Sequence, residues 1–135
     1  MKTFILLRGV PGSGKSTVAK ALSRLWEDRG FMVAGPWEAD SFMTNEKGNY
    51  EFDPKKLGYC HDRCIETCRA AMAFGMAVVI QSNTNTQKWE YEKYLDAAKE
   101  FGYAVQTITV DGEFENAHGV PAEKVQQMRD RFEHE

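Results

Sequence analysis

The chain has 135 residues and a mass of 15.4 kDa, which predicts one domain over residues 1–135 and excludes a separate substrate domain beside a large catalytic one. Its 42% hydrophobic residues, with eight Phe, five Tyr and three Trp, suffice for a buried core and exclude a disordered chain. The net charge of −3 excludes a general electrostatic affinity for long nucleic acids, so any nucleic-acid contact must be local.

The first third of the chain predicts a strand, a helix and a second strand. The short apolar run at residues 4–7 is typical of a strand that is buried on both faces. Apolar residues spaced three and four apart predict a helix over residues 16–29. We expect a second strand over residues 31–34, with a ragged end near Trp37.

The rest of the chain continues this alternation. We expect helices over 53–74, 87–101 and 121–132 and strands over 76–80 and 103–110. Asp53 has the residue type of a helix cap, and either Asn85 or Thr86 is expected to cap the next helix. Pro121 is expected to open the last one.

The cysteines and the N-terminus favour a cytoplasmic protein. The chain has three cysteines, Cys60, Cys64 and Cys68, spaced four residues apart in one segment. An odd number of cysteines with this spacing does not form the disulfide framework of a secreted domain. Three thiolates along one helix face cannot surround a single metal ion, so we expect small buried core side chains there. The apolar N-terminal run is broken by Arg8 and is too short to span a membrane, and we expect no membrane partner.

A glycine-rich motif lies between the first predicted strand and the first helix. Residues 9–16, GVPGSGKS, match the pattern G-x-x-x-x-G-K-[S/T] in full. Such glycines let successive N–H groups point into one cup, where a triphosphate binds at the helix N-terminus. Lys15 is expected to reach the β- and γ-phosphates and Ser16 to ligate Mg²⁺, so the motif predicts ATP and Mg²⁺ as cofactors. The candidate nucleotide-binding residues are Gly9, Pro11, Gly12, Ser13, Gly14, Lys15, Ser16 and Thr17.

Strands and helices that alternate four times require parallel pairing through right-handed crossovers. Together with the motif, this predicts an α/β, single-domain P-loop NTPase of the nucleoside- and nucleotide-kinase type. We expect a small parallel sheet of four or five strands sandwiched by helices.

The acceptor side should lie beyond the carboxyl ends of the strands. Asp40 follows the second predicted strand, residues 83–85 follow the third and residues 111–115 follow the fourth. Phosphoryl transfer to a hydroxyl needs a carboxylate that accepts the hydroxyl proton. Asp40 is our candidate for this catalytic base. Its alternative role is to cap a short turn through Met43.

Five blocks of sequence, in this order, carry a resemblance to a known family. They are RGVPGSGKST (8–17), Asp40-Ser41-Phe42, NYEFDP (49–54), Asn83-Thr84-Asn85, and His118-Gly119-Val120-Pro121 with Lys124 and Met128. Through them the chain resembles the phage-type 5′-hydroxyl polynucleotide kinases and related small P-loop kinases. The resemblance implies an ATP-dependent kinase in which Asp40 activates the hydroxyl acceptor. It also implies that Asn83, Thr84 and Asn85 line the acceptor pocket, and that the acceptor is the 5′-hydroxyl of a polynucleotide, nucleotide or nucleoside.

The chain departs from this family in its charged residues. It has Gln81-Ser82-Asn83 at the third strand, where relatives often have a carboxylate, and Met43 where an arginine is expected. The segment 111–118, where relatives have a lid with arginines, contains no Lys or Arg. It carries three carboxylates, those of Asp111, Glu113 and Glu115. Because an arginine finger is worth about 10³–10⁵ in rate, its absence predicts slow transfer unless another residue supplies the charge.

Arg8, Arg129, Arg131 and a neighbouring subunit of a homo-oligomer are the candidate sources of that charge. We favour Arg129 as a catalytic residue because the last helix of this architecture packs back beside the nucleotide. Two alternatives stay open. One is a nucleotide-binding interaction module with little transferase activity, and the other is a kinase for another small-molecule hydroxyl.

Overall fold

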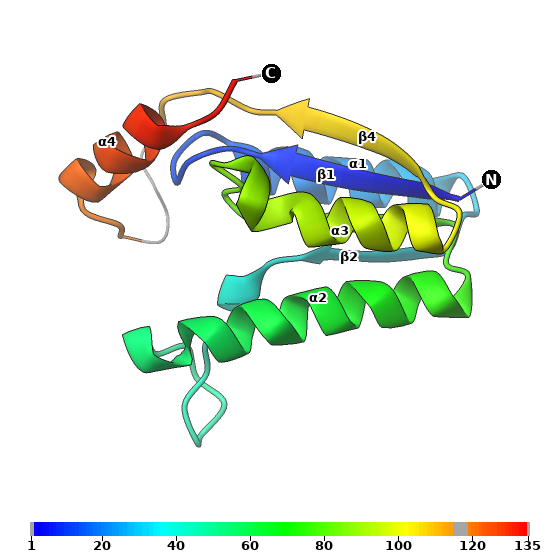
Figure 1. Cartoon of the computed structure of the whole chain (residues 1–135), viewed down its shortest axis with the longest axis horizontal. Helices are drawn as coiled ribbons and strands as arrows, with labels where there is room; N and C mark the ends of the chain where they lie inside the picture. The colour runs from blue at the N-terminus through cyan, green and yellow to red at the C-terminus, as the bar shows by residue number, and fades with distance from the viewer. Residues whose placement is uncertain (1, 115–118, 135) are drawn as a thin grey trace.

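Strands and helices alternate along the chain in the computed structural model, which describes residues 2–114 and 119–134 (Figure 1). The strands are β1 (Thr3–Arg8), β2 (Val33–Trp37), β3 (Val78–Gln81) and β4 (Ala104–Thr109). The α-helices are α1 (Lys15–Asp28), α2 (Leu57–Phe74), α3 (Lys88–Glu100) and α4 (Ala122–Arg131), and short 3-10 helices cover Ala39–Phe42 and Pro54–Lys56. The predicted alternation is confirmed.

The four strands of the described residues form one parallel sheet in the order β2-β3-β1-β4. In β1, Ile5 pairs with Ile80 of β3 on one side and with Gln106 of β4 on the other. Neighbouring parallel strands need a crossover connection, and α1, α2 and α3 each lie in one. The α/β fold predicted from the sequence is confirmed, with the lower of the two expected strand counts.

Helices cover both faces of the sheet because its central strand buries side chains on both sides. Phe4 and Leu6 of β1 belong to a core cluster with side chains of α2 and α3. Ile5 and Leu7 belong to a second cluster with Ala19 of α1. Successive strand residues point to opposite faces, so a strand covered on both reads as an unbroken apolar run.

The three cysteines lie on the buried face of α2. Cys60, Cys64 and Cys68 are each at most 1% exposed and pack in the cluster that α2 and α3 share. The spacing of four residues places all three on one face of the helix, toward the sheet. The prediction of small core side chains is confirmed.

Two helices begin differently from the prediction. Asp53 does accept a hydrogen bond from the Lys55 N–H, at 3.0 Å, but it caps a single 3-10 turn, and α2 begins only at Leu57. Pro121 occupies the N-cap position of α4 and is not its first helical residue.

The cap of α3 was also predicted at the wrong residue. Gln87 is the N-cap, and its side chain forms a reciprocal capping box with Glu90. Asn85 and Thr86 were the predicted caps, but Asn85 is buried in another network and the Thr86 hydroxyl donates to the Glu90 carboxylate.

The carboxyl ends of the strands meet at one edge of the sheet, on the left in Figure 1. The loop of residues 9–14 follows β1 there, the 3-10 helix Ala39–Phe42 follows β2, and residues 82–87 follow β3. α4 lies at the same end (Figure 1). Among the described residues, no helix combines the length and apolar composition needed to cross a bilayer.

Candidate phosphate-binding and acceptor site

The loop between β1 and α1 forms a cup of backbone amides. Gly12 and Gly14 have positive φ angles of 85° and 94°, which glycine adopts without the strain that a Cβ brings. Gly14 is the N-cap of α1 and no side chain caps the helix. The N–H groups of the first turn are therefore left for an external acceptor, and the partial positive charge at the helix end favours an anion.

A buried hydroxyl in this loop supports the same interpretation. Ser13 is 1% exposed, and its Oγ has no hydrogen-bond partner within the described part of the chain. A buried hydroxyl without a partner is costly, so an unpaired one in a native fold calls for a ligand or an ion as explanation. The amide cup and the Ser13 hydroxyl fit a polyphosphate.

The close packing beneath the cup makes Gly9 sensitive to substitution. A Cβ at Gly9 would lie 2.7 Å from the carbonyl oxygen of Val110, which is backbone and cannot rotate away. We therefore expect Gly9→Ala to shift the loop and to weaken nucleotide binding about 5- to 150-fold, as overpacking of about 1–3 kcal/mol implies. Titration with a fluorescent nucleotide measures the change.

Gly58→Ala is the matched control, because a Cβ at this position of α2 meets nothing within 4 Å. It should leave nucleotide affinity unchanged and raise stability by about 0.5–1 kcal/mol. Equal nucleotide affinities for Gly9→Ala and Gly58→Ala would contradict the assigned role of the loop.

Lys15 is the first residue of α1 and is held inside the site. Its ammonium donates to the carbonyl oxygen of Ser82 and lies 3.8 Å from Oε2 of Glu38. Burial lowers the pKa of Lys15, while the carboxylates of Glu38 and Asp40 act in the opposite direction. Both carboxylates therefore lie on the side of the cup to which the ammonium points.

The sequence reasoning assigned no role to Glu38. This residue directly follows β2 at the carboxyl edge of the sheet, so the rule that selected Asp40 applies equally to Glu38.

Asp40 lies in the 3-10 helix Ala39–Phe42, and its side chain is half-buried. Its Oδ1 accepts a hydrogen bond of 3.1 Å from the hydroxyl of Tyr50. The N-cap position of this short helix is Glu38, and the Met43 N–H bonds to the backbone carbonyl of Asp40. The alternative interpretation placed the cap of this turn at Asp40, whereas its N-cap position belongs to Glu38.

Hydrogen bonds from the loop of residues 83–85 hold the 3-10 helix that carries Asp40. Oδ1 of Asn83 accepts from the Ala39 N–H at 2.7 Å, which ties the 3-10 helix to the end of β3. The carbonyl oxygen of Thr84 accepts from the Gly9 N–H at 3.1 Å, which ties the same loop to the cup. Asn83 and Thr84 are half-buried and connect the two halves of the site.

Asn85 lies inside the protein. It is 2% exposed, and its Nδ2 donates to the carbonyl of Leu7 and to Oε1 of Gln81, both at 2.7 Å. Its amide is thus used to hold the loop onto β1. The resemblance implied that Asn85 lines the acceptor pocket, but these contacts give it a supporting position.

Two of the cation positions considered from the sequence are structural. Arg8 is 1% exposed and donates to the carbonyls of Asn85, Thr86 and Glu133. Met43 is 1% exposed in the core, where its side chain packs in the cluster that α2 and α3 share. Arg8 is therefore excluded as the missing charge.

The remaining candidates belong to α4. The Arg131 guanidinium donates to the Thr86 hydroxyl at 3.2 Å, whereas Arg129 is half-buried on α4 at the carboxyl end of the sheet.

The segment after β4 runs against the phosphate cup. The Phe114 N–H donates to the carbonyl of Gly12 at 2.7 Å. The lid carboxylates Asp111 and Glu113 lie in this described segment, whereas Glu115 and His118 lie outside the described residues.

Known proteins match this chain in sequence. A family model described as an AAA domain matches residues 4–118. NEDD4-binding protein 2 of Homo sapiens is 33% identical over 139 residues, which cover 96% of this chain and 8% of that protein. The 2′,3′-cyclic-nucleotide 3′-phosphodiesterase of Pongo abelii is 28% identical over 112 residues, which cover 79% of this chain and 24% of that protein. The chain thus spans less than a quarter of the length of these two curated relatives.

Solved structures share the fold. A gluconokinase from Sinorhizobium meliloti 1021 has a TM-score of 0.62 at 16% identity, covering 98% of this chain and 75% of that one. A chain of the Pnkp1/Rnl/Hen1 complex has a TM-score of 0.61 at 19% identity, and the match covers 93% of this chain and 38% of that one. The Mycobacterium tuberculosis APS kinase CysC in complex with AMPPNP and APS has a TM-score of 0.56 at 12% identity, covering 96% of both chains. At such identities the likeness concerns the fold alone.

Proposed function

This chain belongs to the AAA domain family and has a P-loop kinase-like fold, and from that premise we propose that it transfers the γ-phosphoryl group of ATP to a hydroxyl. One observation carries the proposal. An amide cup holds the buried Lys15, and Asp40, which a separate strand delivers to the same edge of the sheet, is near enough to act electrostatically on the Lys15 ammonium. A triphosphate donor and a hydroxyl acceptor need this pairing.

Each residue has a proposed task. The backbone of residues 9–16 and the Lys15 ammonium would hold the phosphates, and Ser16 would hold Mg²⁺. When bound, Mg²⁺ would neutralise negative charge that develops on the phosphates during transfer. Asp40 takes the proton of the acceptor hydroxyl as the oxygen bonds to the γ-phosphorus and the bond to the bridging oxygen breaks, which releases ADP.

We propose the 5′-hydroxyl of a nucleic-acid end as the acceptor. Exposed aromatic side chains lie on the segment next to Asp40 and on the first turn of α2, at Tyr50, Phe52 and Tyr59. Bases stack on such rings, and the neighbouring Lys55 and Lys56 supply local positive charge. Asn83 would position the acceptor through its hold on the Asp40 helix, and Arg129 would supply positive charge from α4.

A second candidate function is a nucleotide-binding interaction module with little transferase activity. The observation in its favour is the charge of the described lid residues 111–114, which include two carboxylates and no Lys or Arg. In this role, nucleotide occupancy of the cup would change the hydrogen bond from the Phe114 N–H to the Gly12 carbonyl, and a partner protein would bind the altered surface.

Transfer of label from γ-radiolabelled ATP separates these functions. The acceptors are a nucleoside, a mononucleotide, short DNA and RNA with a 5′-hydroxyl, and gluconate as a small polyhydroxyl acid. We expect label on the 5′-hydroxyl oligonucleotide, none on its 5′-phosphorylated twin and none with Lys15→Ala. Label on gluconate alone would contradict the proposed acceptor. Tight nucleotide binding without any labelled product would favour the interaction module.

The affinity for ATP should depend on the protonation of Lys15. Burial lowers the pKa of this ammonium in the free protein, and a bound triphosphate stabilises its charged form. At pH values above the pKa that Lys15 has in the free protein, ATP binding therefore takes up a proton. In that pH range we expect the Kd for ATP to rise by up to about tenfold per pH unit.

Isothermal titration between neutral pH and pH 10 measures this dependence. Lys15→Arg is the control, because its guanidinium keeps its proton throughout and its profile should stay flat. Parallel profiles for the two proteins would remove Lys15 from the binding site.

A further inference from the structure

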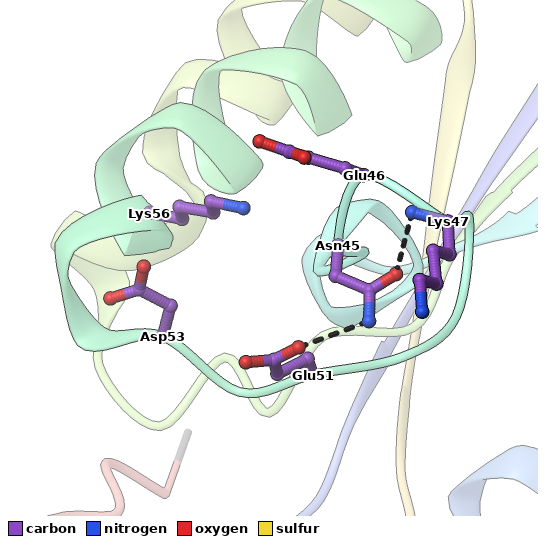
Figure 2. A pocket seen from close by; sticks show the side chains of 6 residues that line it. All are labelled: Asn45, Glu46, Lys47, Glu51, Asp53 and Lys56. Atoms are coloured by element: carbon purple, nitrogen blue, oxygen red, sulfur yellow. Dashed lines mark hydrogen bonds between the residues drawn. The ribbon is translucent and has the colours of Figure 1, made fainter.

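A hairpin next to Asp40 is organised by one side chain. Thr44 and Tyr50 pair as an antiparallel bridge. Oδ1 of Asn45 accepts from the N–H of Lys47 at 2.9 Å, and its Nδ2 donates to Glu51 at 3.0 Å (Figure 2). The same Oδ1 also accepts from the N–H of Asn49, at 3.1 Å. The Asn45 amide thus fixes the turn from within, as Asx turns do.

The hairpin is also attached to the body of the protein on both sides. The Glu51 N–H donates to the carbonyl of Met43, whose side chain is buried in the core. The Lys56 ammonium, at the start of α2, donates to the carbonyl of Thr44 at 3.2 Å. A hollow of about 450 Å³ lies between the hairpin and residues 53–56 (Figure 2). The position of Tyr50 is therefore set by the fold.

At this position the Tyr50 hydroxyl meets the proposed base. It donates to Oδ1 of Asp40 at 3.1 Å, while 56% of the residue remains exposed. Partial burial and the neighbouring Asp40 carboxylate raise the pKa of Tyr50, so its hydroxyl keeps its proton at neutral pH. A donor that binds one carboxylate oxygen restricts rotation of the carboxylate group.

We infer that Tyr50 is a positioning residue, whose hydroxyl orients the Asp40 carboxylate toward the acceptor. This role rests on the proposed function, because it requires Asp40 to be the base. The hairpin of residues 44–51 is then part of the acceptor site, and the exposed ring of Tyr50 lies where an incoming acceptor would pass. Tyr50 acts through Asp40 and takes no proton itself.

Tyr50→Phe tests the inference because it removes the hydroxyl and keeps the ring. We expect kcat to fall about 3- to 10-fold, as the loss of one hydrogen bond implies, with the KM for ATP unchanged. Tyr103→Phe is the control, because Tyr103 precedes β4 at the opposite edge of the sheet and its hydroxyl donates to the carbonyl of Met76 at 2.6 Å, so this variant should keep the wild-type kcat. In an Asp40→Asn background, Tyr50→Phe should have no further effect on kcat. A wild-type kcat for Tyr50→Phe would overturn the inference.

A spectroscopic measurement tests the contact without relying on activity. 3-Fluorotyrosine placed at position 50 reports its own ionisation by ¹⁹F NMR. Asp40→Asn should lower the pKa of this phenol, because the neighbouring negative charge is removed. An unchanged phenol pKa would overturn the contact itself. If the wild-type protein labels no acceptor, the proposed function fails and this role fails with it. If the wild-type protein transfers phosphate and Tyr50→Phe transfers it at the same rate, only the inference about Tyr50 is overturned.

Discussion

Asp40→Asn is expected to lower the single-turnover rate of phosphoryl transfer by about 10²–10⁴-fold, the contribution of a general base. Asparagine has nearly the same shape and can still accept the hydrogen bond of 3.1 Å from Tyr50, so the substitution removes the basic oxygen and little else. Nucleotide affinity should stay the same or rise slightly, since one negative charge near Lys15 and the phosphates is lost. Rapid quench with saturating ATP and acceptor measures the rate.

Asp62→Asn is the control for this substitution. Asp62 is an exposed carboxylate on α2, so its loss changes the net charge equally without touching the site. Its rate should equal that of the wild type. If Asp40→Asn transfers phosphate at the rate of Asp62→Asn, Asp40 is not the base.

The largest expected loss of stability comes from Arg8→Met. The buried Arg8 guanidinium donates to three backbone carbonyls, those of Asn85, Thr86 and Glu133, and packs against the rings of Tyr91 and Phe132 at 4.9 and 4.5 Å. Methionine fills much of the volume but donates no hydrogen bond, so all three carbonyls lose the guanidinium, and that of Thr86 keeps only the N–H of Glu133, at 2.7 Å. We expect the free energy of unfolding to fall by about 2–4 kcal/mol, as measured by urea denaturation.

Arg131→Met is the comparison variant, because Arg131 is exposed and its guanidinium donates to the Thr86 hydroxyl at 3.2 Å. It should cost no more than about 1 kcal/mol. Hydrogen exchange should also show α4 opening earlier in Arg8→Met, since Arg8 fastens the segment after α4 to the start of α3. Equal losses of stability in the two variants would contradict the anchoring role of Arg8.

The fold and the phosphate cup were predictable because their signals are local. The motif at residues 9–16 and the alternation of apolar strands with amphipathic helices each occupy a few consecutive residues. Backbone sterics and burial act on the same short scale, so residue pattern and element agree. The three cysteines were predictable for the same reason, since their spacing of four matches one helix face.

The contacts that build the site could not be predicted because they join distant residues. Arg8 looked like a free cation beside the motif, yet it bonds to the carbonyl of Glu133, 125 residues away. Asn85 looked like an acceptor ligand, yet it bonds to Leu7, 78 residues away. Asn45, Gly48 and Asn49 are residue types that favour a turn, but only the tertiary fold places Tyr50 against Asp40.

A crystal structure of the protein with a non-hydrolysable ATP analogue, Mg²⁺ and a short 5′-hydroxyl oligonucleotide tests the central claim most directly. We predict the γ-phosphate in the amide cup beside Lys15, and the 5′-hydroxyl between that phosphorus and the carboxylate of Asp40. A triphosphate bound away from residues 9–16, or an acceptor hydroxyl out of hydrogen-bond reach of Asp40, would contradict it.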